Sequence, residues 1–407
     1  MTKFTRRVLL GSIAATPLAM PGIIHAQSTS RPVKIGLLSD MGGPYRDVGG
    51  PGNRAAVELA VQDFGGSVLG RPIEIVQGDD QNKPDVAASL AREWIDNQGV
   101  DVLMDGAASS SGLAIQQIAR EKQHIYLITG PASSDFTGKQ CSPYGVHFAY
   151  DTYALAHGTG SALTKAGGKT WFFVTADYAF GYALERDTIA AVKAAGGQVL
   201  GNVRAPLGTA DFSSYLVQAK TSGAKVFGFA NAGTDLQNCI KQAAEFGISQ
   251  SGTRMATLLM AINDVNSLGL NTCQGLVYTD SFYWDMTDRT RAFAKRWGAK
   301  MGGMVPGLLH AANYCAANHW LKSVKAAGTT DAGKVVAKMK ATPVNDFYNS
   351  NVKIREDGRV MHVMYLWQVK SPAESKYPYD YCKKLATISP AEAWRPLNEG
   401  GCALVKS

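Results

Sequence analysis

Two groups of small hydroxyl residues form the part of the sequence best suited to bind an anion. Residues 109–111 follow the apolar run 102–104, and residues 132–134 follow the run 125–128. Serines between a strand and a helix direct hydroxyls and free backbone N–H groups to the positive end of the helix dipole, which suits a carboxylate. Helix capping is the better explanation of one such cluster, but two at neighbouring strand ends favour binding. The candidate residues are Ala108, Ser109, Ser110, Ala132, Ser133 and Ser134.

Aromatic residues in the loops after other apolar runs suit the hydrophobic body of a ligand. Any single ring is more often part of a core, so the recurrence of rings at predicted strand ends is what favours a pocket. The candidates are Tyr45, Tyr153, Phe180, Phe282 and Trp284. Together with the serine clusters, these rings predict a site for a carboxylate on a hydrophobic body.

The loops belong to two successive series of β-α units. In the first series short apolar runs alternate with longer amphipathic stretches, as in a parallel sheet. The runs are 33–38, 73–76, 102–104 and 125–128, and the stretches are 51–64, 84–98 and 111–122. The same order restarts at 171–175. Because ligands of open parallel sheets bind at the carboxyl ends of the strands, we predict an α/β protein of two doubly wound parallel-sheet lobes with the site at those ends.

The N-terminus has the features of an export leader. Residues 1–26 combine Arg6 and Arg7, an apolar stretch and a small residue, Ala26, at the end, which predicts cleavage between Ala26 and Gln27 and a periplasmic location. The arginine pair resembles a twin-arginine signal, and a Sec leader is the alternative. Two prolines interrupt the apolar stretch, so we expect no integral membrane segment in the mature chain.

Charge and motifs argue against several functions. The net charge of +8 is spread over the 407 residues, so we expect no nucleic-acid partner. The residues 50–55 only loosely match a dinucleotide fingerprint, and 168–170 match only the end of a P-loop. The sequence contains neither G-x-S-x-G nor H-E-x-x-H. We therefore expect no enzyme, no cofactor and no metal.

The cysteines suggest one disulfide. All six occur singly, without a C-x-x-C pair that would indicate zinc or thioredoxin chemistry. Cys141 and Cys402 both stand in loop-like sequence, and export to an oxidising compartment would allow them to pair. We treat this pairing as a hypothesis.

Several short segments, in this order and spacing, resemble a known family. They are residues 36–45, 109–111, 130–134, 178–181 and 232–235. They resemble the leucine/isoleucine/valine-binding branch of the type I periplasmic solute-binding proteins, which serve ABC importers. A longer C-terminal tail resembles a subgroup that takes up aromatic or hydrophobic carboxylates.

The resemblance implies roles for individual residues. Ser109 and residues 132–134 would hold the ligand carboxylate, and Phe180 would contact it from the other lobe. Asp235 would pair with the ammonium of an amino acid, although an aspartate stands where the family more commonly has a glutamate. Phe282 and Trp284 would line the wall.

These observations lead to one functional hypothesis. We expect lobe one to comprise 33–147 and 281–355, lobe two 148–280 and 356–370, and a three-segment hinge between them, with the tail 371–407 packed on the lobes. Closure of the hinge would trap an amino acid or an aromatic acid for the permease subunits of an ABC importer, and we expect a monomer. The alternatives are a ligand sensor that feeds a signalling partner and an exported amide hydrolase.

Overall fold

The structure is a computed structural model that describes residues 1–2 and 31–406. Apart from its first two residues, the predicted export leader lies outside the described residues, and so does its cleavage point. The chain divides into two units, Met1–Arg31 and Pro32–Ser407, and the second contains both sheets. In the described part of the chain, no helix is both long and apolar enough to cross a membrane.

The first lobe is built on a six-stranded sheet in the order β2-β3-β1-β4-β5-β6. Its strands are β1 (Val33–Ser39), β2 (Ser67–Val68), β3 (Arg71–Asp79), β4 (Val102–Asp105), β5 (Ile125–Ile128) and β6 (Gly145–His147). All its pairs are parallel except β2 with β3. The central strands β4 and β5 are buried along their whole length, which explains their uninterrupted apolar sequence.

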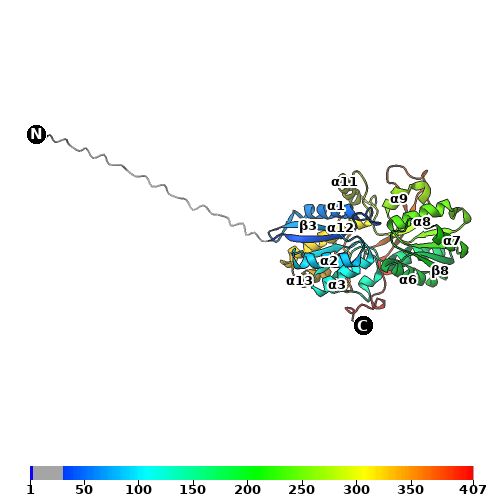
Figure 1. Ribbon diagram of the computed structural model, residues 1–407, viewed down its shortest axis with the longest axis horizontal. Coiled ribbons are helices and arrows are strands. Elements are labelled where there is room, and N and C mark those ends of the chain that lie inside the picture. The colour runs from blue at the N-terminus through cyan, green and yellow to red at the C-terminus, as the bar shows by residue number, and fades with distance from the viewer. Residues whose placement is uncertain (3–30, 407) are drawn as a thin grey trace. The chain divides into compact units, whose positions relative to one another are not determined.

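Helices from two distant parts of the chain cover this sheet (Figure 1). They are α1 (Gly50–Phe64), α2 (Pro84–Asp96), α3 (Ser109–Glu121), α11 (Asp288–Lys300), α12 (Leu308–Ala327) and α13 (Ala332–Ala341). The late helix α12 packs on α1, and the Trp297 indole of α11 donates to the Gly52 carbonyl of α1 at 2.9 Å. The segment after residue 281 therefore returns to the first lobe.

The second lobe is built on a seven-stranded sheet in the order β13-β12-β11-β10-β9-β7-β8. Its strands are β7 (Thr170–Ala176), β8 (Gln198–Ala205), β9 (Val226–Ala230), β10 (Arg254–Thr257), β11 (Val277–Asp280), β12 (Met364–Val369) and β13 (Cys382–Ile388). The last two strands are antiparallel. Because β13 lies within 371–407, part of the predicted tail extends this sheet rather than only packing on the lobes.

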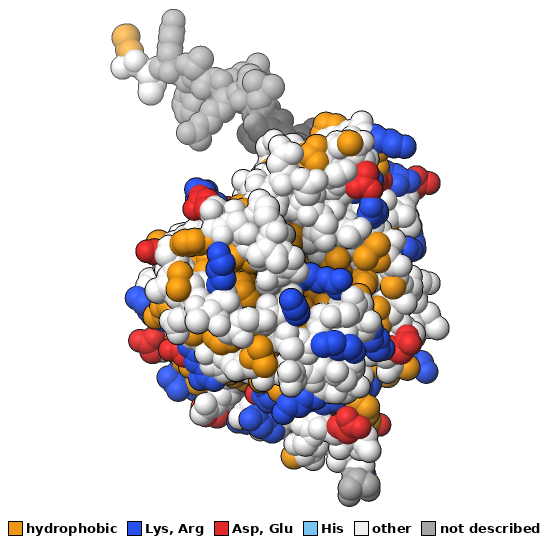
Figure 2. All heavy atoms as spheres, turned by 90° about the vertical axis from the view of Figure 1, so that its right-hand side faces the viewer, with side chains coloured by type: hydrophobic (Ala, Val, Ile, Leu, Met, Phe, Trp, Pro, Cys, Tyr) orange, Lys and Arg blue, Asp and Glu red, His pale blue; other side chains and the backbone are white. Residues whose placement is uncertain are grey.

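The helices of the second lobe lie on the right of Figure 1. They are α4 (Thr152–Leu155), α5 (Ser161–Lys165), α6 (Ala179–Ala194), α7 (Ser213–Thr221), α8 (Gly233–Glu245), α9 (Ile262–Leu268) and α10 (Leu270–Cys273), and α14 (Pro390–Ala393) follows β13. Short 3-10 or π turns are η1 (Ser134–Thr137), η2 (Ala156–Gly160), η3 (Ser249–Ser251) and η4 (Leu397–Glu399). Lys and Arg side chains lie at several separate places on the face in Figure 2, with acidic and apolar side chains between them.

The chain crosses between the lobes three times, after β6, after β11 and before β12. Arg359, in the last crossing, is fully buried and donates to the carbonyls of His147 and Ala149 in the first crossing. It also lies 3.6 Å from the Asp151 carboxylate and 4.2 Å from the ring of Trp394. One buried guanidinium thus fastens two crossing segments to each other and to the tail.

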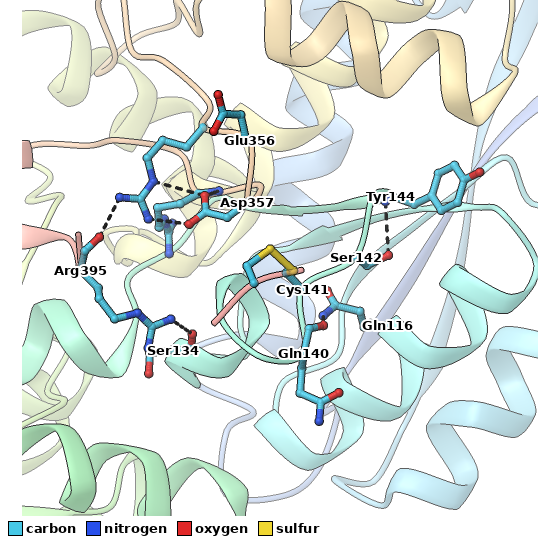
Figure 3. Close-up of a disulfide and its surroundings, with 12 residues drawn as sticks. Gln116, Ser134, Gln140, Cys141, Ser142, Tyr144, Glu356, Asp357 and Arg395 are labelled. Carbon is cyan, nitrogen blue, oxygen red and sulfur yellow. Dashed lines mark hydrogen bonds and ion pairs between the residues drawn. A yellow bond between two sulfur atoms is a disulfide. The ribbon is translucent and has the colours of Figure 1, made fainter. Parts of the chain in front are cut away.

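A disulfide joins Cys141 to Cys402, with Cα atoms 5.6 Å apart (Figure 3). This is the pairing that the loop contexts suggested. Arg395 reinforces the attachment because its guanidinium donates to the Ser134 carbonyl at 2.8 Å, and Arg355 donates to the Arg395 carbonyl at 2.7 Å. The end of the chain is therefore pinned to the first lobe near the hinge.

Candidate ligand-binding site

A cavity lies between the lobes at the carboxyl ends of their strands. From the first lobe it is lined by Tyr45, Val48, Gly49, Asn53, Asp105, Ala107, Ser109, Gly130, Ala132, Leu308 and Leu309. From the second lobe and the hinge it is lined by Tyr150, Tyr178, Phe180, Ala232, Gly233, Leu259, Met260, Ala261, Asp264, Thr279 and Asp280. About 40 Å³ is open to the centre of a water molecule, which is room for more than one water.

Most of the wall is apolar. Val48, Leu308 and Leu309 face the cavity from the first lobe, and Leu259 and Met260 face it from the second. Four rings complete the wall, those of Tyr45, Tyr150, Tyr178 and Phe180. This lining suits a hydrophobic body that is buried on several sides.

The N-terminus of α3 forms one polar end of the cavity. The Ser109 hydroxyl oxygen accepts from the backbone N–H groups of Ala132 and Ser133, at 3.2 and 3.1 Å, so its own proton is directed elsewhere. No side chain caps α3, which leaves its first N–H groups for another acceptor. Asp105 and Ala107, in the turn before the helix, have φ values of 70° and 34°, a conformation that non-glycine residues rarely adopt. This end of the cavity therefore presents hydrogen-bond donors.

Three acids also line the cavity, whereas none of its lining residues in the described chain is Lys, Arg or His. Burial raises the pKa of Asp105 and of Asp264 to about 6, and it raises the pKa of Asp280 to about 8. The Asp264 carboxylate is satisfied locally, since it accepts from the Gln237 side chain and the Ala261 backbone at 2.8 Å each. Within the described residues no group of three or more His, Cys, Asp and Glu side chains is arranged to hold a metal.

Contacts between the lobes cover the cavity. The hydroxyls of Tyr45 and Tyr178 form a hydrogen bond across the gap, and the Thr234 N–H donates to the Pro44 carbonyl at 3.1 Å. Gly233 has a φ of +59°, and a Cβ there would lie 2.3 Å from the Pro44 oxygen. The lobes therefore meet closely where only a glycine fits.

Four of the predicted site residues lie in the cavity wall, namely Tyr45, Ser109, Ala132 and Phe180. Ala108 and Ser133 are buried beside them at the N-cap positions of α3 and η1, and of the two only the Ser133 side chain accepts a capping hydrogen bond. Ser110 is half-buried and does not line the cavity. Ser134 donates to the Asp187 carboxylate at 2.7 Å and is outside the wall as well.

The other predicted residues lie outside the wall because neighbouring groups engage their side chains. The Tyr153 ring stacks on His157 at 3.8 Å, and the Trp284 indole donates to the Tyr379 carbonyl at 3.1 Å. The Asp235 carboxylate accepts from the Gly208 N–H at 3.1 Å. Phe282 packs within a cluster of rings formed by Phe293, Phe347 and Tyr348.

Asn53, Asp105 and Asp280 line the cavity but were not among the sequence candidates. Asp105 and Asp280 are the last residues of β4 and β11. An acid at the end of an otherwise apolar strand was the signal that could have identified them, because the carboxyl ends of parallel strands form the binding edge. Asn53 lies in the first turn of α1 and carries no such signal.

The comparisons with known proteins agree with this architecture. A family model described as periplasmic binding protein matches residues 32–376. The chain belongs to this family. The family and the two-lobed α/β fold predicted from the sequence are thus confirmed.

Two solved structures are similar over nearly the whole chain. A periplasmic binding protein from Burkholderia mallei is 52% identical, with a TM-score of 0.90 over 92% of this chain and 99% of that one. A branched chain amino acid ABC transporter periplasmic ligand-binding protein from Burkholderia xenovorans is 41% identical, with a TM-score of 0.81 over 91% and 99%. A Leu/Ile/Val-binding protein homolog of Brucella melitensis is 27% identical over 64% of this chain and 67% of its own.

Proposed function

We propose that the protein is the periplasmic receptor of an ABC importer and captures a small carboxylate with a hydrophobic body. The observation that carries this proposal is the cavity between the lobes, in which apolar walls lead to the uncapped N-terminus of α3 and the Ser109 hydroxyl. The similarity to the Burkholderia xenovorans transporter protein supports the transport role. The features of residues 1–26 support export.

Capture follows from the placement of these groups. The ligand carboxylate accepts hydrogen bonds from Ser109 and from the first N–H groups of α3, and its body packs against Phe180 and the leucines of the wall. Closure brings Tyr45 of one lobe to Tyr178 of the other and excludes water. Because the ligand stabilises the closed form, the permease subunits distinguish loaded from empty receptor by the relative position of the lobes. The lining set offers binding groups and not a nucleophile with its base, so the ligand is released unchanged.

Replacement of Ser109 by alanine tests this assignment. The loss of a hydrogen bond to a charged group is expected to weaken carboxylate binding by about 1.5 to 3 kcal/mol. Ser110→Ala is the matched control, because Ser110 starts the same helix but does not line the cavity. A thermal-shift screen of amino acids, benzoates, cinnamates and short-chain acids first identifies a ligand, and titration calorimetry then measures its affinity for the variants. Equal affinities of the two variants for that ligand would place the carboxylate elsewhere.

A further inference from the structure

A buried aspartate shapes the loop that follows β1. Asp40 is 1% exposed. Its carboxylate accepts from three backbone N–H groups of this loop, those of Gly42 at 3.2 Å, Gly43 at 2.5 Å and Tyr45 at 2.8 Å. A Cβ on Gly43 would lie 2.8 Å from both carboxylate oxygens, so the loop wraps closely around this side chain. The carboxylate therefore fixes the backbone of residues 42–45.

A second loop holds this carboxylate from the side. The Asn82 amide donates to Oδ2 of Asp40 at 2.6 Å. Asn82 lies in the loop after β3, and β3 pairs with β1 so that Asp79 is level with Ser39. The two loops therefore leave the sheet side by side. Asn82 itself has a φ of +56°, and its N–H donates to the Asp80 carboxylate at 3.1 Å, which fixes the residue that carries the amide.

The loop that Asp40 holds is the one that meets the second lobe. The Pro44 carbonyl accepts from the Thr234 backbone, and the Tyr45 hydroxyl bonds to a tyrosine of the other lobe. Both contacts require the lobes to be together. Neither Asp40 nor Asn82 lines the cavity. Their side chains can therefore act on a ligand only through the loop.

We propose that Asp40 and Asn82 are positioning residues that set ligand affinity, because they hold residues 42–45 in the conformation that meets the second lobe. This inference rests on the proposed function, in which closure of the lobes traps the ligand. A loop that is already ordered in the open form loses little conformational entropy on closure. Without the Asn82 amide the loop must become ordered as the lobes close, and this cost lowers the population of the closed form. The ligand should then leave faster, while its association with the open form stays the same.

Two glycine substitutions in one loop test the role of the amide. Asn82→Gly removes the amide and keeps the left-handed backbone. Gln81→Gly is the matched control, because Gln81 has a φ of +53° but its exposed side chain accepts from the Lys83 ammonium at 3.3 Å and does not reach Asp40. Titration calorimetry and stopped-flow fluorescence use whichever of L-leucine, L-phenylalanine, benzoate and cinnamate binds the wild type most tightly. Asn82→Gly is expected to bind it about 5- to 20-fold more weakly through faster dissociation, and Gln81→Gly within about twofold of the wild type.

Two further variants separate positioning from a purely structural role. Gly233→Ala already disturbs the contact, since a Cβ at this position would lie 2.3 Å from the Pro44 oxygen. In that background Asn82→Gly should weaken binding by about twofold or less, because the loop no longer meets the second lobe as it does in the wild type. Asp40→Asn turns a donor toward the Tyr45 N–H or the Asn82 amide, so it should bind at least as weakly as Asn82→Gly.

The outcomes separate this inference from the proposed function. Equal affinities of Asn82→Gly and Gln81→Gly overturn the positioning role and leave the proposed function intact. The same holds if Asn82→Gly lowers the free energy of unfolding in urea but not the affinity, if its loss of affinity is as large in the Gly233→Ala background, or if Asp40→Asn binds like the wild type. If none of the four compounds binds the wild-type protein, the proposed function fails and the positioning role with it.

Discussion

Replacing Asp280 by asparagine is expected to stabilise the ligand-free protein, because the native carboxyl is buried without a cation to neutralise it. Burial raises the pKa of Asp280 to about 8 from an ordinary value of 3.8, and the opposing groups are only the backbone N–H groups of Phe282 and Ser281. Asparagine keeps an oxygen for the Phe282 N–H and carries no proton that titrates. The substitution therefore removes the cost of burying the acid and keeps its local hydrogen bond.

The magnitude follows from the two pKa values. At pH 7 this carboxyl is ionised in the unfolded chain and protonated in the folded protein. This pH lies about 3 units above the pKa of the unfolded chain, and each unit contributes about 1.4 kcal/mol, so the difference in stability is on the order of 4 kcal/mol. The wild-type protein loses stability as the pH rises from about 4 to about 8, because only the unfolded state releases the proton in that range. Below and above that range the contribution of Asp280 no longer changes with pH.

Urea unfolding of ligand-free protein at pH 5, 7 and 8 measures this difference. Unfolding and dialysis beforehand remove any ligand that copurifies. Asp235→Asn is the control, because burial raises the pKa of Asp235 only to about 6, so its gain should be smaller and level off above that pH. A gain for Asp280→Asn that does not depend on pH, or a loss of stability at pH 7, would refute the reasoning. The expected gain would mean that the protein retains a costly acid for its function.

Two further perturbations probe the lobes and the tail. Gly233→Ala places a methyl group 2.3 Å from the Pro44 oxygen of the other lobe, so the lobes of the variant should stay further apart when ligand is saturating. Small-angle X-ray scattering measures this as a larger radius of gyration, and a value equal to that of the wild type would contradict the prediction. Replacing Cys141 and Cys402 by serine opens a loop of 261 residues and should lower the free energy of unfolding by up to about 5 kcal/mol in urea titrations. A loss below about 1 kcal/mol would mean that the other contacts of the tail suffice.

The sequence alone was enough for the fold and for the edge of the sheets where the cavity lies. Short apolar runs such as residues 102–104 are typical of buried strands, and helical stretches between such runs favour parallel pairing. The place of Ser109 and Phe180 in the cavity wall was predictable for the same reason, since each lies in the first turn of the helix that follows a strand. The spacing of apolar residues involves only residues that are close together in the chain, so the sequence shows it without the tertiary structure.

The choice among the acids was decided only by the tertiary structure. Asp235 and Asp280 both follow or end apolar strands of the second lobe, yet Asp235 accepts from Gly208 and Asp280 faces the cavity. Which way each carboxyl points depends on the rotation of α8 and the pleat of β11. Asp105 and Asn53 become partners only because β4 lies beside β1, whose loop leads into α1. The sequence by itself determined that the sheet edges carry acids, serines and rings, and the packing of two lobes across a hinge determined which of them share a cavity.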